Sequence, residues 1–263
     1  MSETSFVEQT KTFFQELDVP MVQKPLVFDS LSSTNAKAKE LAQQGAQEGT
    51  VILSRTQEQG RGRFDRTWTS PEGGIYFSII LRPTCKPEQA ALLTFVGALA
   101  VWKTIDDFCD LAPSIKWPND VRIRDKKVSG VLLESESDSA GMKYVVLGIG
   151  INLNIDIDVI SKSFYATSLS YELGINLDYY RFLKDVLTNL HSFYAHFALG
   201  NHAWLLQEWK LHSDTFGKKV RVESSAKTIE GIASDVDESG FLLVTTKTGE
   251  VKKVTSGDCI YFG

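Results

Sequence analysis

The chain changes in texture near residue 216, and this change constrains the fold more strongly than any single motif. After Phe216-Gly217 come only short apolar segments, separated by turn signals such as Asp237-Glu238-Ser239-Gly240 and Lys247-Thr248-Gly249. Short strands joined by tight turns are typical of a small β-barrel. We therefore predict two domains, residues 1–216 and residues 217–263, the second of them a barrel.

The residues before this boundary mix the periodicities of helices and strands. Ile75 to Leu81 is apolar throughout, which predicts a buried strand. Pro87 fits the first turn of a long apolar helix, and Ser32-Ser33-Thr34-Asn35 supplies N-caps for another. We expect helices at 6–17, 36–44, 87–108, 179–199 and 202–212, a hairpin turn at 124–127, and strands at 24–28, 49–54, 75–81, 121–123, 128–134, 144–153, 220–222, 229–233, 241–245 and 250–254.

Composition argues against several classes of protein. Hydrophobic residues make up 43% and charged residues 23%, which is ordinary for a globular protein with a sizeable core. The net charge of -5 argues against a protein that coats nucleic acid. Cys85, Cys109 and Cys259 are too far apart for a disulfide framework or a zinc motif, which indicates a reducing compartment. The sequence has neither a signal peptide nor an apolar run of about 20 residues, so we expect a cytoplasmic protein that does not enter a membrane.

A polar segment between two strand-like runs carries Gly60-Arg61-Gly62-Arg63. The glycines let the backbone approach a ligand closely, and the arginines bring permanent positive charge to the same loop. The segment is not a Walker A loop, since no Gly-Lys-Ser/Thr ends it, and not a dinucleotide fingerprint, since a strand follows it. Taken alone, it is either a phosphate-binding loop or a flexible surface loop with solvated arginines, and the second is the commoner case.

Three further segments could carry chemistry. In Lys116-Trp117-Pro118-Asn119-Asp120, the last residue is either part of an ordinary turn or a hard oxygen ligand for Mg²⁺ beside a nucleotide. Lys127, at the start of 127–130, is either a surface charge at a hairpin tip or a point charge that meets a carboxylate or phosphate in a cleft. The glycines of 148–152 lie inside a strand, which marks either a bulge or the close approach of a ligand.

The order and spacing of these segments resemble the biotin–protein ligases. The series runs through Ser33-Thr34-Asn35, Gln57, Gly60-Arg61-Gly62-Arg63, Trp68, Ser70-Pro71, 116–120, 127–130 and 148–152. The resemblance extends from residue 27 to the end. It implies an α+β fold in which a class II synthetase-like, biotin–lipoate ligase-like catalytic domain with a mixed sheet precedes a small SH3-like β-barrel.

The resemblance implies a ligase that activates biotin with ATP to biotinyl-5′-AMP. The enzyme then transfers biotin to one lysine of a biotin carboxyl carrier protein, in acetyl-CoA carboxylase or a related biotin-dependent carboxylase. Arg63 and Lys127 are then the catalytic residues, because the biotin carboxylate and the α-phosphate are both anionic and need cations to approach each other. Asp120 becomes the Mg²⁺ contact, and ATP and Mg²⁺ are the cofactors. The chemistry consists of positioning and charge stabilisation, with no covalent enzyme intermediate.

Carried over position by position, the family's motifs assign two sets of contacts. Hydroxyl and amide groups suit the ureido ring of biotin, which needs both donors and acceptors. The biotin-binding set is Ser33, Thr34, Asn35, Gln57, Arg61, Gly62, Arg63, Lys127, Gly130 and Gly148. The adenylate-binding set is Gly60, Arg61, Arg63, Trp68, Asn119, Lys127 and Asn152. Backbone N–H groups of the loop glycines are expected to face the phosphate.

Departures from the family pattern set further expectations. Relatives often carry a third glycine where this chain has Asp65, whose carboxylate repels a phosphate unless it pairs with Arg66 or Arg61. Bifunctional relatives have a helix-turn-helix domain ahead of the first strand, where this chain has too few residues, so we expect no specific DNA binding. The cysteines have no catalytic role, and the four histidines, all in predicted helices, are expected on helix surfaces. The resemblance also allows a homodimer through the edge of the central sheet.

Two other functions fit part of the sequence. A lipoate–protein ligase or octanoyltransferase has a related fold, but the 116–120 segment argues against it. A non-enzymatic module could use the C-terminal barrel to bind protein or RNA, with the remainder as a scaffold. A scaffold, however, does not need a cationic loop and a polar cluster in one chain. We therefore expect the biotin ligase.

Overall fold

The structure, a computed structural model, describes residues 4–139, 141–160, 165–224 and 228–262. The helices are α1 (Phe6–Glu16), α2 (Thr34–Gln43), the 3₁₀ helix η1 (Pro87–Ala91), α3 (Leu92–Phe108), α4 (Ile157–Ile160), α5 (Leu169–Leu173), α6 (Tyr179–Ala198) and α7 (His202–His212). The strands of the main sheet are β1 (Lys24–Leu31), β2 (Thr50–Gln57), β3 (Ile75–Leu81), β4 (Pro113–Lys116), β5 (Asp120–Ile123), β6 (Lys126–Asp138) and β7 (Gly141–Ile151). The C-terminal sheet consists of β8 (Lys219–Glu223), β9 (Thr228–Val236), β10 (Leu242–Thr245), β11 (Val251–Val254) and β12 (Asp258–Tyr261).

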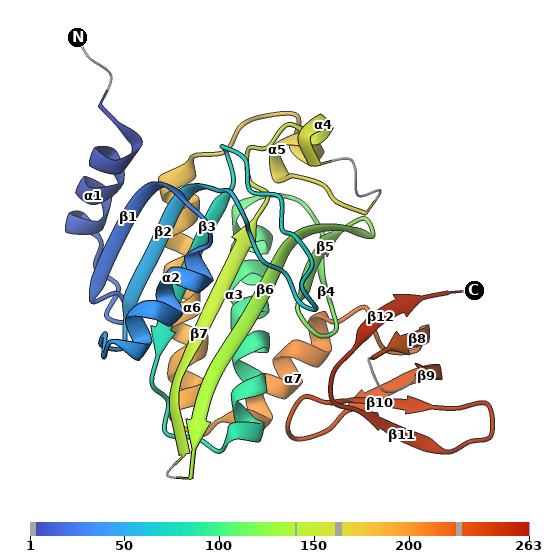
Figure 1. Ribbon diagram of the computed structural model, residues 1–263. Coiled ribbons are helices and arrows are strands. Elements are labelled where there is room, and N and C mark those ends of the chain that lie inside the picture. The colour runs from blue at the N-terminus through green and yellow to red at the C-terminus, as the bar shows by residue number, and fades with distance from the viewer. Residues whose placement is uncertain (1–3, 140, 161–164, 225–227, 263) are drawn as a thin grey trace.

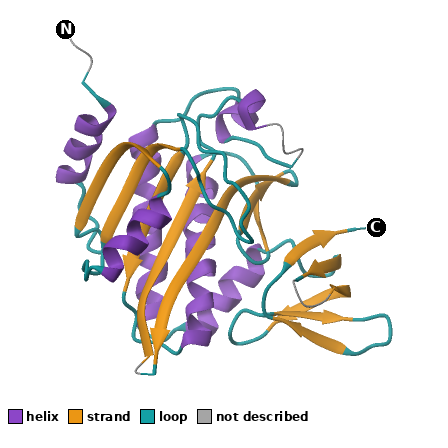
Figure 2. Ribbon diagram, in the orientation of Figure 1, coloured by secondary structure: helices purple, strands orange, loops and turns teal. Residues whose placement is uncertain are grey.

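Figures 1 and 2 show a main domain, in which helices flank a large sheet, and a smaller all-strand part beside it. The main sheet has the order β1-β2-β3-β7-β6-β5-β4, and the C-terminal sheet has the order β11-β10-β9-β8-β12. β1 and β2 run parallel, whereas the remaining neighbours in the main sheet are antiparallel. The main sheet is therefore mixed, as predicted.

Helices cover both faces of the main sheet. α2 packs on β2, β3 and β7 from one side, while α3 packs on β5, β6 and β7 from the other and is itself covered by α6. Every residue of β3 is buried, which confirms the prediction for this apolar strand and follows from its place between two apolar layers. Among the described residues, no helix combines the length and the apolarity needed to cross a bilayer.

The helix α2 is fixed at both of its ends. Ser33 is the N-cap, and its side chain accepts a hydrogen bond from the backbone N–H of Ala36 at 3.4 Å. At the other end, the Arg82 guanidinium donates to the carbonyl oxygens of Ala42 and Ala46, which satisfies acceptors that a helix end leaves open. The predicted helix therefore exists, and its first turn is held against the main sheet.

The predicted hairpin between β5 and β6 is confirmed. Arg124 and Asp125 have φ values of 48° and 67°, which is the left-handed pair that a tight hairpin turn requires. The register pairs Asp120 with Gly130. The hairpin therefore brings the segment that ends in Asp120 next to the one that begins with Lys127.

Several elements differ from the sequence-based expectations. The predicted helix at 87–108 begins as the 3₁₀ turn η1 before α3. β1 continues three residues past the predicted end, because its polar residues still pair in register with β2 up to Leu31 and Gln57. The sequence analysis missed β4, α4, α5 and β12, all of which are five residues long or shorter. Periodicity carries little information over so few residues.

Buried polar contacts join the C-terminal sheet to the main domain. Asp214 accepts hydrogen bonds from Arg122 Nη1 at 3.0 Å and from the Tyr261 hydroxyl at 2.8 Å. The Tyr261 hydroxyl also lies 2.8 Å from Thr215 Oγ1, and Trp117 Nε1 donates to the Gly240 carbonyl at 3.0 Å. Burial, with the Asp214 carboxylate as a second cause, raises the pKa of Tyr261. The two sheets are thus joined by groups that are buried or partly shielded from solvent.

Candidate functional site

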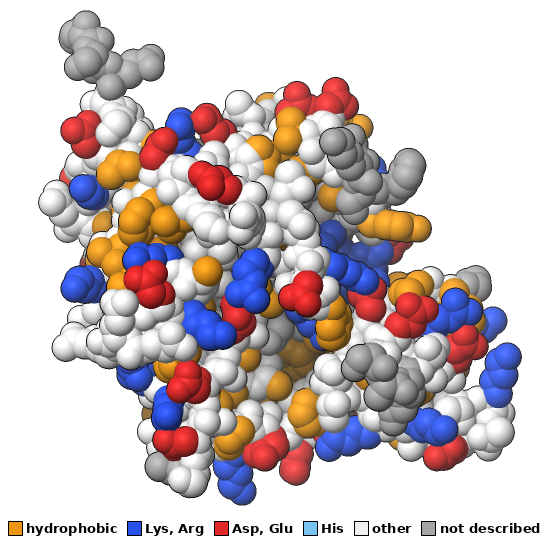
Figure 3. All heavy atoms as spheres, viewed as in Figure 1, with side chains coloured by type: hydrophobic (Ala, Val, Ile, Leu, Met, Phe, Trp, Pro, Cys, Tyr) orange, Lys and Arg blue, Asp and Glu red, His pale blue; other side chains and the backbone are white. Residues whose placement is uncertain are grey.

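A cavity of about 610 Å³ opens between the main sheet and the C-terminal sheet. Figure 3 shows the hollow on this face, with Lys and Arg side chains gathered around it. Its wall comes from the first turn of α2, strands β4 to β7, strand β12 and residues 61–69 between β2 and β3. Residues 60–69 are here called the glycine loop. The volume is typical of a small-molecule site.

One end of the cavity is a network of uncharged polar side chains. The backbone N–H and Oγ1 of Thr34 donate to Gln57 Oε1 at 2.8 and 3.1 Å, and Gln57 Nε2 donates to Ser70 Oγ at 2.8 Å. Ser78 Oγ lies 2.8 Å from Thr34 Oγ1 and 2.6 Å from Asn35 Oδ1. These bonds hold the side chains in fixed orientations, so the buried end presents both donors and acceptors.

Glycines of β6 and β7 form the floor of the cavity. A Cβ at Gly148 would overlap Asn35 Oδ1, and a Cβ at Gly150 would lie 2.7 Å from Trp68 Nε1. A Cβ at Gly130 would lie 3.0 Å from Lys127 Nζ. Gly148 and Gly150 pair in regular register with β3, so they do not form a bulge. Their role is to let side chains lie directly against the strand backbone.

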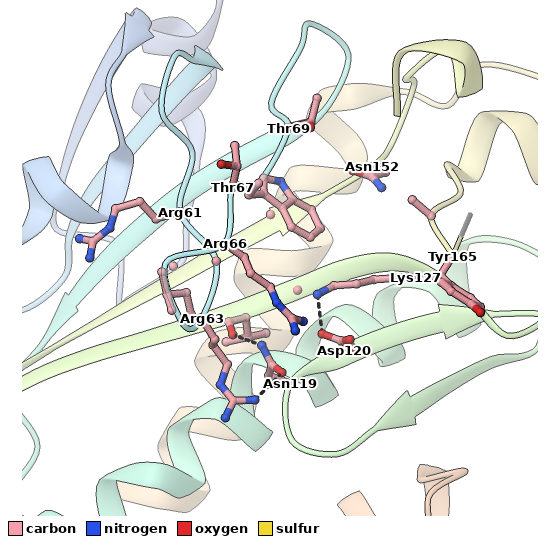
Figure 4. Close-up of a pocket in the computed structure, with 18 of the residues that line it drawn as sticks. Arg61, Arg63, Arg66, Thr67, Thr69, Asn119, Asp120, Lys127, Asn152 and Tyr165 are labelled. Carbon is pink, nitrogen blue, oxygen red and sulfur yellow. Dashed lines mark hydrogen bonds and ion pairs between the residues drawn. The ribbon is translucent and has the colours of Figure 1, made fainter. Parts of the chain in front are cut away.

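The other end of the cavity carries Lys127, Asp120, Arg63 and Asn119 (Figure 4). Lys127 Nζ lies 2.6 Å from Asp120 Oδ1 and 5.1 Å from the centre of the Trp68 ring. Arg63 Nη1 donates to Asn119 Oδ1 at 3.4 Å, and Asn119 Nδ2 donates to the backbone of β6 at 2.7 Å. Lys127 therefore points into the cleft, and is not a free charge at the hairpin tip.

The cations around the cavity differ in their partners. Arg61 pairs with Glu134, Arg66 pairs with Asp258 of β12, and Arg122 pairs with Asp214. Within the described part of the chain, Arg63 and Lys116 are the pocket-lining cations that form no ion pair. Lys116 lies 4.6 Å from the centre of the Tyr261 ring. Burial lowers the pKa of Arg63, although Asp120 and Asp258 oppose the shift. A guanidinium stays charged at any physiological pH, so Arg63 offers a ligand a positive charge that is not tied up in a direct ion pair.

The tip of the glycine loop has an unusual backbone. Phe64 and Asp65 have φ values of 54° and 56°, in the left-handed region that favours glycine. The N–H of Gly62 donates to the Arg66 carbonyl at 2.7 Å, so it does not face a phosphate as expected. Among the described residues, neither predicted partner forms an ion pair with Asp65: Arg66 pairs with Asp258 and Arg61 with Glu134.

The cavity gathers nearly all of the residues that the motifs predicted. Gly60 is the exception: it does not line the cavity, and a Cβ there would collide with the Trp68 carbonyl. The lining residues from the predicted sets are Ser33, Thr34, Asn35, Gln57, Arg61, Gly62, Arg63, Trp68, Asn119, Asp120, Lys127, Gly130, Gly148 and Asn152. The prediction assigned no ligand-binding role to other lining residues that carry charge or a hydroxyl, which are Arg66, Thr67, Thr69, Lys116, Arg122, Asp125, Tyr165, Asp258 and Tyr261. Arg66 could have been included from the sequence, because it is a third arginine in the same loop.

The cysteines and histidines lie apart from any metal-binding arrangement. All three cysteines are free, and burial raises the pKa of Cys109 to about 11 and that of Cys259 to about 12. The described residues contain no cluster of three His, Cys, Asp or Glu side chains that could hold a metal ion. Mg²⁺ does not need such a cluster, because it is commonly held by one or two carboxylates together with substrate phosphates. Asp120 fits that description, since its carboxylate lines the cavity beside Lys127.

Comparison with known proteins gives two matches to family models. Residues 27–152 match the Biotin/lipoate A/B protein ligase family, and residues 215–261 match the Biotin protein ligase C terminal domain. The first match contains most of the cavity wall, and the second contains β12.

Known proteins align with nearly the whole of this chain. The bifunctional ligase/repressor BirA of Bacillus subtilis is 34% identical over 90% of this chain and 74% of its own. The biotin–[acetyl-CoA-carboxylase] ligase of Paracoccus denitrificans is 32% identical over 88% of this chain and 97% of its own. The structure of the biotin protein ligase from Aquifex aeolicus in complex with biotin and ATP aligns with a TM-score of 0.77 at 28% identity, over 91% of this chain and 99% of that one.

Proposed function

This chain belongs to the biotin protein ligases, and from that membership we propose a division of labour within its cavity. The enzyme activates biotin with ATP to biotinyl-5′-AMP and transfers biotin to a lysine of a biotin-dependent carboxylase such as acetyl-CoA carboxylase. The observation that carries the division is the polarity of the cavity itself: uncharged donors and acceptors fill one end, and cations gather at the other.

The uncharged end holds biotin. Thr34, Asn35 and Gln57 are held by hydrogen bonds that leave their orientation fixed before a ligand arrives, and Ser33 lies beside them as the cap of α2. A ureido ring offers one carbonyl acceptor and two N–H donors, which suits such a mixed wall. Val131, Leu132 and Ile149 also line the cavity and provide apolar surface for the body of biotin.

The cationic end holds the reacting groups. A biotin carboxylate oxygen attacks the α-phosphorus of ATP, the bond to the bridging oxygen breaks, and pyrophosphate leaves. Arg63 and Lys127 lower the repulsion between the two anions as they approach. Arg63 is ready for this role because it forms no ion pair among the described residues, whereas Lys127 must share its charge with Asp120. Trp68, Asn119 and Asn152 line the same end and would contact the adenylate.

The second step needs little from the protein beyond positioning. The neutral amine of the acceptor lysine attacks the carbonyl carbon of the mixed anhydride. The amide C–N bond forms, the carbonyl C–O bond to the phosphate breaks with its electrons going to AMP, and the nitrogen releases one proton to solvent. The chain's task is to keep water from the anhydride until the acceptor arrives. The glycine loop is tied to β12 through the Arg66–Asp258 ion pair, which supports a role for the loop in shielding the bound anhydride from solvent.

Magnesium would be held by Asp120 together with the phosphates of ATP. The ion would supply positive charge to the phosphates during the first step. We expect chelation of Mg²⁺ to prevent formation of biotinyl-5′-AMP in wild-type enzyme, and Asp120→Asn to raise the Mg²⁺ concentration required for half-maximal adenylate formation. An unchanged Mg²⁺ requirement in that variant would remove Asp120 from the ion's ligands.

Incubation with biotin, Mg-ATP and a purified biotin carboxyl carrier domain tests the function. We expect one lysine of the acceptor to gain the mass of a biotinyl group, and we expect lipoate to be a far poorer substrate under the same conditions. A folded enzyme that leaves the acceptor unmodified, or prefers lipoate, would overturn the proposal.

The Arg63→Ala variant tests the cationic end in particular. Removing the unpaired charge weakens retention of biotinyl-5′-AMP, so the adenylate escapes and labels lysines other than the acceptor's. Mass spectrometry of a mixture of the acceptor and an unrelated protein measures this loss of selectivity. Selective labelling at the wild-type rate would show that Arg63 does not hold the adenylate.

The remaining proposals concern partners and location. The three free cysteines support a reducing compartment, and we propose the cytoplasm. The acceptor is the carrier domain, and no specific DNA binding is expected from residues 1–263, whose net charge is -5. A homodimer through an edge of the main sheet would sediment at twice the mass of the 29.3 kDa chain. Operator protection in a footprint at physiological salt would contradict the DNA prediction.

We also propose the domain division at residues 216/217, with an SH3-like barrel after it. The C-terminal sheet begins two residues later, at Lys219. Limited proteolysis that cuts first near residue 216 would support this division, and a first cut within either sheet would contradict it.

A further inference from the structure

Glu134 lies on β6 just behind the wall of the cavity and contacts two parts of the site. Its Oε2 accepts a hydrogen bond from Asn35 Nδ2 at 3.1 Å. Arg61 Nη1 of the glycine loop donates to Glu134 Oε1 at 3.2 Å and to Oε2 at 3.4 Å. Only 17% of the Glu134 side chain is exposed, compared with 45% of Arg61. One shielded carboxylate thus joins the biotin end of the cavity to the glycine loop.

The first contact fixes which way the Asn35 amide points. Its Oδ1 accepts from Ser78 Oγ, while its Nδ2 donates to Glu134 and to the Leu132 carbonyl. An amide can turn over and exchange these two ends, but in the reversed position its oxygen would face the carboxylate. Gly148 lies directly beneath the amide, where an added Cβ would overlap Asn35 Oδ1, so the amide packs against the backbone of β7. Glu134 therefore sets the donor–acceptor pattern that Asn35 shows to the cavity.

The second contact holds the glycine loop. Figure 4 shows Arg61 pointing away from Lys127 and Asp120, so its guanidinium is not part of the cationic end in this conformation. The ion pair instead ties the first limb of the loop to β6. Lys39 of α2 lies 3.7 Å from Glu134 Oε1, so a second cation faces the same carboxylate.

We propose that Glu134 is a positioning residue of the ligase. It touches neither reacting group, and it acts through Asn35 on biotin recognition and through Arg61 on the glycine loop. The effect through Asn35, here called the Asn35 arm, rests on the proposed function of the cavity. The effect through Arg61, here called the loop arm, is a property of the ligand-free protein. The two arms are therefore tested by different measurements.

Glu134→Gln is the informative variant because it keeps the shape and removes the charge. A glutamine offers one acceptor oxygen, so its NH₂ group must face a donor, either Asn35 Nδ2 or Arg61. Glu136→Gln is the matched control: Glu136 lies two residues further along β6, accepts from the Tyr144 hydroxyl at 2.9 Å and contacts Lys143 at 3.5 Å, away from the cavity lining. Thermal unfolding of both variants checks that each is folded.

Trypsin cleavage of the ligand-free protein tests the loop arm. We expect Glu134→Gln to be cut after Arg63 and Arg66 about two- to fivefold faster than wild type, the range that loss of one partly exposed ion pair supports. Arg61→Gln should show the same acceleration, and the double variant should be no faster than either single one. Cleavage of Glu134→Gln at the rate of the Glu136→Gln control would overturn the loop arm.

Steady-state adenylate formation tests the Asn35 arm. We expect Glu134→Gln to raise KM for biotin severalfold with a smaller change in KM for ATP, because the disturbed amide contacts biotin and not the nucleotide. Arg61→Gln alone should not reproduce this bias towards biotin. Equal changes in both KM values, or none, would overturn this arm. If wild type itself forms no biotinyl-5′-AMP, the proposed function fails, while the trypsin result still decides whether Glu134 anchors the loop.

Discussion

At the scale of the residue, the departure at Asp65 stands out. It lies in the glycine loop with a φ of 56°, and the arginines that could neutralise it pair with Glu134 and Asp258. Its carboxylate is therefore left to act on any phosphate that the loop covers. The resemblance identified this position from the sequence, but only the structure shows that both expected partners are engaged elsewhere.

Asp65→Asn should strengthen nucleotide binding. Asparagine tolerates the left-handed backbone as aspartate does, so the substitution changes the charge and keeps the loop conformation. We expect ATP to bind about twofold more tightly at low salt, the size of a charge interaction across several ångströms of water, and the gain to vanish at high salt. Calorimetry at two salt concentrations measures it, with the exposed Glu58→Gln as control. A gain that persists at high salt would point to a change in loop conformation.

Other contacts between residues could not be predicted from the sequence, because they join positions that are far apart in the chain. Gln57 and Ser33 were assigned from motif spacing, and the structure places both on the cavity. The ion pair between Arg66 and Asp258 had no such signal, since the two residues meet only when β12 lies beside the glycine loop. The contacts of Glu134 with Asn35 and Arg61 were hidden for the same reason, because strand pairing and not spacing brings them together.

At the scale of the element, two glycines of β7, two residues apart, lie under the two ends of the cavity. Gly148 underlies Asn35, and Gly150 underlies Trp68. Alanine at 148 should displace the Asn35 amide and mainly weaken biotin binding. Alanine at 150 should push the Trp68 indole outward and mainly weaken binding of the nucleotide. Separate titrations of each variant with biotin and with ATP measure the split, and the same loss for both ligands in both variants would contradict it.

The packing of α7 on α3 provides a prediction about pH. The ring of His212 stacks on Trp102 with centroids 3.5 Å apart, and burial lowers the pKa of His212, although Glu208 and Asp106 oppose the shift. The unfolded chain therefore binds this proton more tightly than the folded one. Stability is fully present above the ordinary histidine value of 6.5, and is lost as pH falls from there through the lowered folded-state pKa.

His212→Phe keeps the stack and removes the titrating group. We expect the unfolding free energy of the variant, measured by urea denaturation, to fall less between pH 7 and pH 5 than that of wild type. Parallel losses in the two proteins would show that His212 does not contribute to the acid sensitivity.

Long elements followed from the sequence, and so did several short strands that lie between clear turn signals. The run from His202 to His212 gave α7 with its observed limits, and the alternating apolar and turn segments gave four strands of the C-terminal sheet. β12 holds only four residues, all of which line the cavity, and Tyr261 also bonds across the domain junction. Its place was decided by pairing with β8, which no local pattern encodes.

At the scale of the whole molecule, the two sheets are held together at Tyr261. Tyr261→Phe removes hydrogen bonds to Asp214 and Thr215 while keeping the ring that Lys116 and Arg122 contact. We expect the unfolding free energy to fall by about 1–2 kcal/mol. Urea denaturation measures the change, and Tyr171→Phe, whose side chain is exposed, should leave the stability near that of wild type. A loss in both variants of the same size would contradict a specific role for the junction.

The pairing of the pocket's cations has a consequence for selectivity among anions. An inorganic phosphate ion that enters the cavity can reach Arg63 and Lys116, but at Arg61, Arg66 and Lys127 it must compete with carboxylates that already pair with them. It gains few contacts in exchange, because it is too small to span the cavity. A ligand that carries several phosphates, a ribose and a base can displace these carboxylates while filling the remaining space. The internal carboxylates thus compete with simple anions for these cations and weaken their binding. A large ligand that makes many contacts gains enough to displace them.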